Sequence, residues 1–137
     1  MMKGVRLYAA MLIGSFAAAA AQAHHSVAGQ FDLQKTVRLV GVVSEVEWIN
    51  PHIYIHFSVP NEDGSTTTWM LETVPTAMTR KAGLTKSMLR GNGETLTIDV
   101  HPARDGTPNL GYIIKITFPD GRFFQFKENN TVAATGS

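Results

Sequence analysis

An uninterrupted alternation of apolar and polar residues near the middle of the chain constrains the fold most strongly. Between residues 52 and 59, every second position is apolar: Ile53, Ile55, Phe57 and Val59. The intervening positions carry His52, Tyr54, His56 and Ser58. Because successive side chains of a β-strand point to opposite faces, this pattern predicts a strand with one face in a core and one polar face outside.

The same two-residue period predicts four further strands, over residues 36–48, 66–72, 94–101 and 111–118. The first of these changes phase past Gly41, which suggests a bulge or a sharp bend within one long strand. Residues 74–82 are predicted to form a short helix, with Thr73 as its cap, Pro75 in its first turn and Gly83 as its left-handed stop. A second short turn is expected over residues 85–90, and residues 122–126 are a candidate final strand.

Three strands, a helix and two strands, with a bend in the first strand, are the element order of an OB-fold. We therefore predict an all-β domain with one short helix, built as an OB-fold-like five-stranded barrel. A lipocalin-like barrel or a simple sandwich is the alternative, and the mid-chain helix argues against both. In an OB-fold, strands two and three form the ligand face, flanked by the loops after strands one and four.

The first 23 residues have the pattern of a secretory signal peptide. Lys3 and Arg6 supply the positive start, residues 7–20 form an uncharged apolar stretch, and small Ala21 and Ala23 precede the expected cut. The apolar stretch is shorter than the ~20 residues that a membrane-spanning helix needs. We predict cleavage after Ala23, with cleavage after Ala21 as the alternative. The mature protein is then expected in the periplasm or secreted, without a membrane span.

The predicted organisation is a signal peptide (residues 1–23), an N-terminal arm (24–35), one barrel domain (36–127) and a flexible tail (128–137). Removing the first 23 of 137 residues leaves 114, enough to bury a core without disulfides, and the chain has no cysteine for a thiolate metal site. The cut also removes two of 12 basic residues, leaving ten against 11 acidic ones and a net charge of −1. Because the basic residues are scattered, no nucleic-acid partner is expected.

Several short motifs mark a resemblance to a known family. They are His24-His25-Ser26, Gly41-Val42-Val43, Glu47-Trp48, Asn50-Pro51-His52, Trp69 with Glu72, Arg80 to Gly83, and Pro119-Asp120-Gly121-Arg122. With these motifs the chain resembles a family of small secreted bacterial proteins described as a domain of unknown function, over nearly all of the mature sequence. The resemblance implies export and a β-barrel domain, and it brings no catalytic residues.

Histidines are the residues with the clearest chemical potential. After cleavage, His24 becomes the first residue, and an amino-terminal histidine can chelate a metal through its α-amine and its ring. All-nitrogen sites of this kind suit copper(II), with nickel(II) as a competitor, and the feature resembles histidine-brace copper proteins. His52 and His101 are expected in the two loops that border the ligand face. We therefore expect copper(II) to be held by His24 with His52 or His101, with His25 as an alternative ligand.

A metal-free interpretation uses the same face. Tyr54 and His56 are expected to project outward from strand two, and Arg104 lies beside His101 where it can grip an anion. In this alternative the domain binds a peptide, a protein or a small ligand, and the histidines make ordinary hydrogen bonds. Glu45 and Glu47, two residues apart, are interpreted as part of a solvated strand edge.

Binding is favoured over catalysis. The sequence contains no nucleophile elbow, phosphate loop or dinucleotide fingerprint. An oxidative copper enzyme is a third hypothesis, but such an enzyme needs a broad substrate surface that the sequence does not indicate.

Overall fold

The computed structural model describes residues 26–127 and 132–135, and most of its regular structure is β-strand. The strands are β1 (Val37–Trp48), β2 (Ile53–Pro60), β3 (Thr66–Glu72), β4 (Leu96–Pro102), β5 (Leu110–Thr117), β6 (Phe123–Phe126) and β7 (Val132–Thr135). The helical segments are α2 (Ser26–Gln30), α3 (Thr76–Lys81), α4 (Lys86–Arg90) and the single turn η1 (Gly91–Gly93). In the described part of the chain, no helix is long and apolar enough to cross a membrane.

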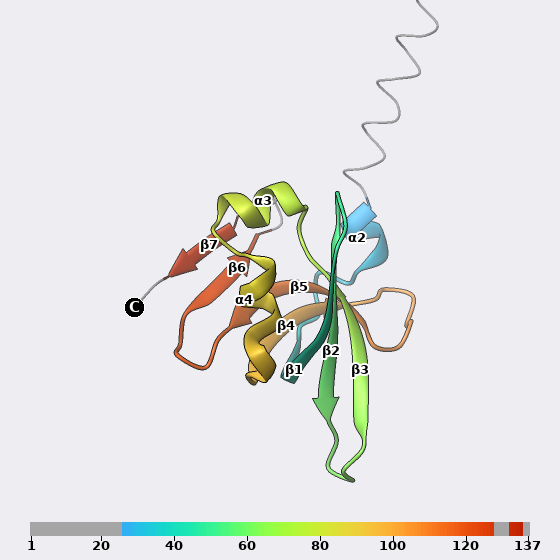
Figure 1. Ribbon diagram of the computed structural model, residues 1–137. Coiled ribbons are helices and arrows are strands. Elements are labelled where there is room, and N and C mark those ends of the chain that lie inside the picture. The colour runs from blue at the N-terminus through green and yellow to red at the C-terminus, as the bar shows by residue number, and fades with distance from the viewer. Residues whose placement is uncertain (1–25, 128–131, 136–137) are drawn as a thin grey trace, which may run out of the picture.

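Five of the strands close into a barrel. Their order along the sheet is β3-β2-β1-β4-β5, and a parallel pairing of β3 with β5 joins the two ends. Outside the barrel, the β2–β3 hairpin continues as a two-stranded ribbon (Figure 1, bottom). This closure, with helices inserted between β3 and β4, is the topology of an OB-fold. The prediction of an OB-fold-like five-stranded barrel is confirmed.

The first strand bends because it serves two partners. Residues 37–41 pair with β4 and residues 42–48 pair with β2, so the exchange falls next to Gly41. At this point the chain passes so close to β2 that a Cβ added to Gly41 would lie 2.1 Å from the carbonyl oxygen of Ser58. The expected irregularity is present, but the register shift lies between Val43 and Glu45 rather than at the glycine.

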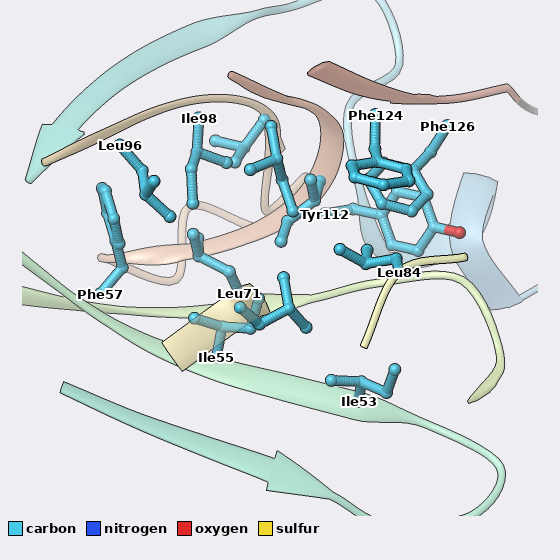
Figure 2. Packing of buried hydrophobic residues seen from close by; sticks show 14 of the residues in the cluster. Ile53, Ile55, Phe57, Leu71, Leu84, Leu96, Ile98, Tyr112, Phe124 and Phe126 are labelled. Atoms are coloured by element: carbon cyan, nitrogen blue, oxygen red, sulfur yellow. The ribbon is translucent and has the colours of Figure 1, made fainter. Parts of the chain in front are cut away.

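The core has the composition that the alternation predicts. Ile53, Ile55 and Phe57 are fully buried, and the apolar residues of β4 face them from the other side of the barrel. Figure 2 shows these side chains converging, with Phe124 and Phe126 of β6 and Leu84 at one end of the cluster. Val59, the last member of the alternating set, is only partly buried because the strand leaves the barrel there.

Helix content is somewhat higher than the single short helix predicted. The predicted helix of residues 74–82 is α3, which is shorter, and its N-cap position is Pro75; the hydroxyl of Thr73 instead donates to the carbonyl of Val74. The turn over residues 85–90 is a second helix, α4. Thr85 caps α4 by accepting a hydrogen bond from the Met88 amide, and Gly91 ends it in the left-handed conformation.

The N-terminal arm is pinned to the barrel by one aromatic residue. Phe31 follows α2, is fully buried, and its ring centroid lies 5.5 Å from that of Tyr112 on β5. Its backbone forms a bridge with Ala103, and Asp32 donates its amide to the carbonyl of Pro102. The arm therefore has a defined position against the β4–β5 end of the barrel.

The predicted tail of residues 128–137 contains a strand that the sequence analysis does not predict, Val132–Thr135. These residues form β7, which pairs antiparallel with all four residues of β6. The composition of the tail does not predict this strand. The strand forms because the edge of β6 offers it hydrogen bonds. The predicted signal peptide, together with His24 and His25, lies outside the described residues.

We predict that Gly41→Ala destabilises the barrel strongly. The new Cβ would collide with backbone atoms of β2, which cannot move aside as a side chain can, so the loss should reach about 1–3 kcal/mol or more. Urea-induced unfolding measures it. Gly29→Ala is the control, since nothing lies within 4 Å of its added Cβ. An equal, small effect of both substitutions would show that the β1–β2 contact is looser than described.

We also predict a pH effect from Tyr112. Burial, together with the nearby Glu72 carboxylate, raises the pKa of Tyr112 from 10.0 to about 12. The unfolded chain loses this proton near pH 10 and the folded chain near pH 12, so unfolding releases a proton in that window. The free energy of unfolding should therefore fall by up to about 2–3 kcal/mol as the pH rises from 10 to 12.

The free energy of unfolding of Tyr112→Phe, measured between pH 10 and pH 12, tests this effect. The variant should lose the part of the decrease that Tyr112 causes. Tyr54→Phe is the control and should keep most of the decrease, because the pKa of the less buried Tyr54 is raised less than that of Tyr112. Identical alkaline profiles for the wild type and Tyr112→Phe would contradict the assignment.

Candidate functional site

A polar pocket lies on the outer face of β2 and β3, the face on which an OB-fold binds its ligands. Its volume is about 440 Å³. The lining residues come from five segments: Gln30 of α2, Glu47 of β1, Tyr54 of β2 with the preceding His52, Met70 and Glu72 of β3, and Leu110 of β5. The lining contains two carboxylates, one imidazole and no Lys or Arg. The pocket therefore suits a positively charged ligand.

Two residues of the pocket lining, His52 and Glu72, contact each other. Nδ1 of His52 lies 2.9 Å from Oε1 of Glu72. Nδ1 is itself buried and lacks a hydrogen bond of regular geometry. Burial raises the pKa of the Glu72 carboxyl, and the neighbouring His52 opposes that rise. The carboxylate is thus removed from water beside a ring that has a second nitrogen, Nε2, left for a ligand.

His52 is positioned by the turn that precedes it. In this turn the Asn50–Pro51 bond is cis. The Thr76 hydroxyl donates to the side-chain oxygen of Asn50 at 2.9 Å, and the Thr76 amide donates to the carbonyl of Pro51 at 3.0 Å. The start of α3 therefore holds the β1–β2 loop in place. The Asn-Pro-His turn is therefore held by Thr76, a buried residue that lies 24 positions after His52 in the sequence.

Tyr54 and His56 occupy the polar face of β2, as the alternation predicts. The rings of Tyr54 and His52 have centroids 6.2 Å apart. Burial raises the pKa of Tyr54, and the carboxylates of Glu72 and Glu47 add to the rise. Nε2 of His56 lies 2.5 Å from Oε1 of Glu47. His56 is therefore tied to Glu47 at the border of the pocket.

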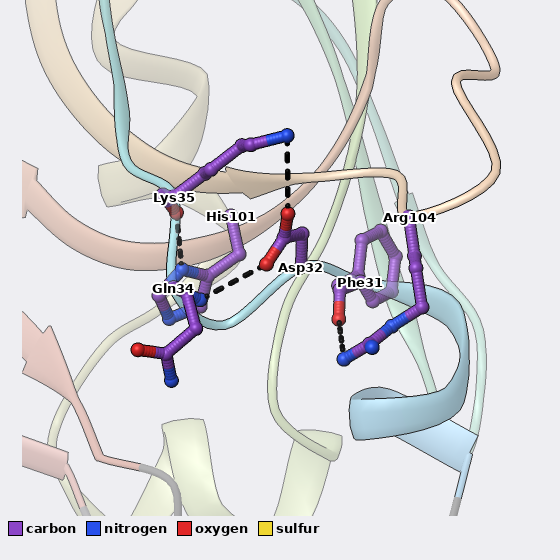
Figure 3. A network of polar contacts seen from close by, with 6 residues as sticks. All are labelled: Phe31, Asp32, Gln34, Lys35, His101 and Arg104. Carbon is purple, nitrogen blue, oxygen red and sulfur yellow. Dashed lines mark hydrogen bonds and ion pairs between the residues drawn. The ribbon is translucent and has the colours of Figure 1, made fainter.

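His101 and Arg104 are placed elsewhere, at the base of the N-terminal arm. Nδ1 of His101 lies 2.7 Å from the carbonyl oxygen of Lys35, and Arg104 donates to the carbonyl of Phe31 at 3.3 Å. Figure 3 shows both side chains among arm residues, where Asp32 also pairs with Lys35. Neither residue lines the pocket, so in this structure both help to hold the arm.

His24 and His25 lie outside the described residues. The described chain starts at Ser26, the first residue of α2, and Gln30 at the other end of that five-residue helix lines the pocket. Across residues 26–127 and 132–135, no group of three or more His, Cys, Asp or Glu side chains is arranged to hold a metal ion. A site of three or more such side chains in this pocket would therefore need ligands from outside the described residues.

Two acidic residues of the pocket were missed by sequence reasoning. Glu47 was interpreted as a solvated edge residue, yet its carboxylate contacts His56. Glu72 entered only as a family motif, yet it pairs with Tyr54 across β2 and β3 and with Tyr112 across β3 and β5. Continuing the alternation of β3 from Thr68 through Met70 to Glu72 would have placed Glu72 on the ligand face.

Comparison with known proteins supports a family assignment without an activity. None of the curated proteins matches the chain, and no solved structure matches it. A family model described as a family of unknown function (DUF6152) matches residues 12–111. The match covers His24, His25 and strands β1 to β4, and it confirms the predicted resemblance. Since it spans well over half of the sequence, the chain belongs to this family of unknown function, DUF6152.

Proposed function

We propose that this protein is exported to the periplasm and binds copper(II) there, with the pocket on β2 and β3 as the binding site. The ligands in this proposal are the α-amine and ring of His24 and the ring of His52, and His25 is an alternative ligand. The protein would act as a metal carrier or buffer rather than as an enzyme.

One observation carries the proposal: the N-terminal arm lies beside His52. Gln30 and His52 line the same pocket. A five-residue helix spans roughly 6 Å from its first Cα to its last, and two further residues reach at most about 7 Å. The new amino terminus is thus tethered within about 13 Å of the pocket wall. Phe31, which anchors the arm, keeps that tether short.

The charges of the pocket favour a divalent cation. Glu47 and Glu72 supply two carboxylates, and the lining has no basic side chain to repel a metal. A carboxylate next to one ring nitrogen of a histidine commonly orients the other nitrogen toward a metal. The 2.9 Å contact of Glu72 with Nδ1 of His52 leaves Nε2 for this role. Of the two loop histidines, the pocket favours His52 over His101, whose ring lies against Lys35.

A metal-free binding module is the second candidate. The pocket also contains Tyr54, Met70 and Leu110, so part of its wall is apolar. A small ligand or a peptide with an amino group could place its charge against Glu47 and Glu72 and its apolar part against these side chains. This ligand would not require the free amine of His24.

The two candidates differ in what a blocked amino terminus does. If the amine is a ligand, acetylating the α-amine of His24 should weaken copper(II) binding by more than the roughly 10–100-fold that loss of an outer-shell partner costs. Competition with a chelator of known affinity measures this loss, and native mass spectrometry on the untagged protein fixes the amino terminus. His52→Ala should cause a comparable loss, whereas His101→Ala should not. Unchanged affinity after acetylation would rule out the brace and favour the metal-free module.

The role of Glu72 can be tested separately. Glu72→Gln removes the charge beside His52 but keeps the size of the side chain, and it should weaken copper(II) binding by roughly 10–100-fold. Glu62→Gln is the matched control, because Glu62 is exposed in the β2–β3 turn and does not line the pocket. Thermal unfolding of both variants checks the fold. An equal affinity for the two variants would contradict an orienting role for Glu72.

A further inference from the structure

The helices between β3 and β4 form a strongly basic surface. Residues 73–93 contain Arg80, Lys81, Lys86 and Arg90 and no acidic residue, although the predicted mature chain has a net charge of −1. All four side chains are exposed. We call this surface, made by α3, α4 and the residues between them, the basic cap. The expectation that the basic residues are scattered is therefore wrong for this segment, which holds four of the ten basic residues of the predicted mature chain.

The positive charge of the basic cap is not neutralised within the described chain. The ion pairs found in residues 26–127 and 132–135 use Lys35, Arg38 and Arg122 as their cationic partners, and two further contacts join carboxylates to His52 and His56. None of the four cations of the cap takes part. Four positive charges on one short segment, without an ion pair among the described residues, produce a local positive field that attracts anions.

The basic cap also contains a pocket. It has a volume of about 460 Å³ and is lined by Trp48, Arg80, Leu84, Thr85 and Lys86. Leu84 is fully buried, Trp48 is half-buried, and the two cations are exposed. The pocket thus combines an apolar wall with two positive groups, which is the chemistry that holds a phosphate attached to an apolar body.

Exposed apolar side chains border this surface. Four large apolar residues are markedly exposed in the described chain, and two of them lie here: Met78 on α3, 38% exposed, and Ile49, 57% exposed. Ile49 directly precedes Asn50, whose side chain is bonded to Thr76 at the start of α3. A free phosphate ion would gain nothing from these apolar groups. A bilayer supplies both anionic headgroups and an apolar boundary for them.

The cap and the acidic pocket open on opposite faces of one strand. Glu47 lines the acidic pocket and its neighbour Trp48 lines the pocket of the cap. Because successive residues of a strand point to opposite faces, contact through the cap leaves the acidic pocket accessible.

We infer that the basic cap docks on the surface of a bilayer that contains anionic phospholipid. The pocket between Trp48, Arg80 and Lys86 receives a phosphate headgroup, and Ile49 and Met78 enter the headgroup boundary. This is surface attachment and needs no membrane-spanning segment. It is independent of the copper proposal, because it uses different residues.

Co-sedimentation of the mature protein with vesicles tests the inference. Vesicles of phosphatidylglycerol mixed with phosphatidylcholine should bind the protein at low salt, and pure phosphatidylcholine vesicles should not. Each basic residue near such a surface contributes roughly a fivefold gain in binding, so Arg80→Gln/Lys86→Gln should lose at least about tenfold. Arg122→Gln/Lys127→Gln removes the same charge elsewhere and should lose less. An equal loss in both double variants would overturn the assignment to the cap.

Two further measurements test whether the apolar residues of the basic cap contact the bilayer and whether the ligand is a membrane rather than a free anion. Met78→Ser should weaken vesicle binding without changing charge, whereas Met70→Ser, at a residue of similar exposure in the acidic pocket, should not. In a Trp69→Phe background, the fluorescence of Trp48 should shift to the blue on anionic vesicles. Saturable quenching of Trp48 by inorganic phosphate without vesicle binding would replace the membrane with a free anion and overturn the proposal.

Discussion

The close crossing of β1 and β2 at Gly41 is the contact on which the rest of the structure depends. β1 can pair with β4 in its first part and with β2 in its second part only because the backbone passes Ser58 without a side chain between the strands. That exchange of partners turns a five-stranded sheet into a closed barrel. Closure pairs the strand edges that an open sheet would expose, and it encloses the alternating residues of β2 and β4 in one core.

The barrel then determines which polar residues meet. His52, in the turn before β2, and Tyr54, in β2, point away from the core. Both lie beside Glu72 of β3. Pairing of β3 with β5 brings Tyr112 next to Glu72 on the barrel wall. Phe31 packs on Tyr112 and thereby holds the N-terminal arm near the same pocket. The position of the arm follows from core packing, and the proposed chemistry of His24 depends on that position.

Charge is divided between two surfaces that meet at the end of β1. The pocket that includes Glu47 carries the carboxylates, and the basic cap next to Trp48 carries cations that form no ion pair within the described part of the chain. A protein with a small net charge can in this way present two surfaces of opposite sign. One suits a cation, and the other suits an anionic surface. The net charge of the sequence does not reveal this division, because the negative charges of one surface and the positive charges of the other cancel.

The sequence by itself determined the barrel and most of its strands, because alternation at a period of two residues is a local property that survives folding. It also determined family membership and the place of α4, which the sequence predicts as a short turn over residues 85–90. Tertiary structure alone decided that His52 meets Glu72 while His101 binds the arm at Lys35, because these contacts depend on strand register and on the path of the arm. It also decided that Val132–Thr135 forms a strand, since so short a segment becomes a strand only where a neighbouring edge offers hydrogen bonds.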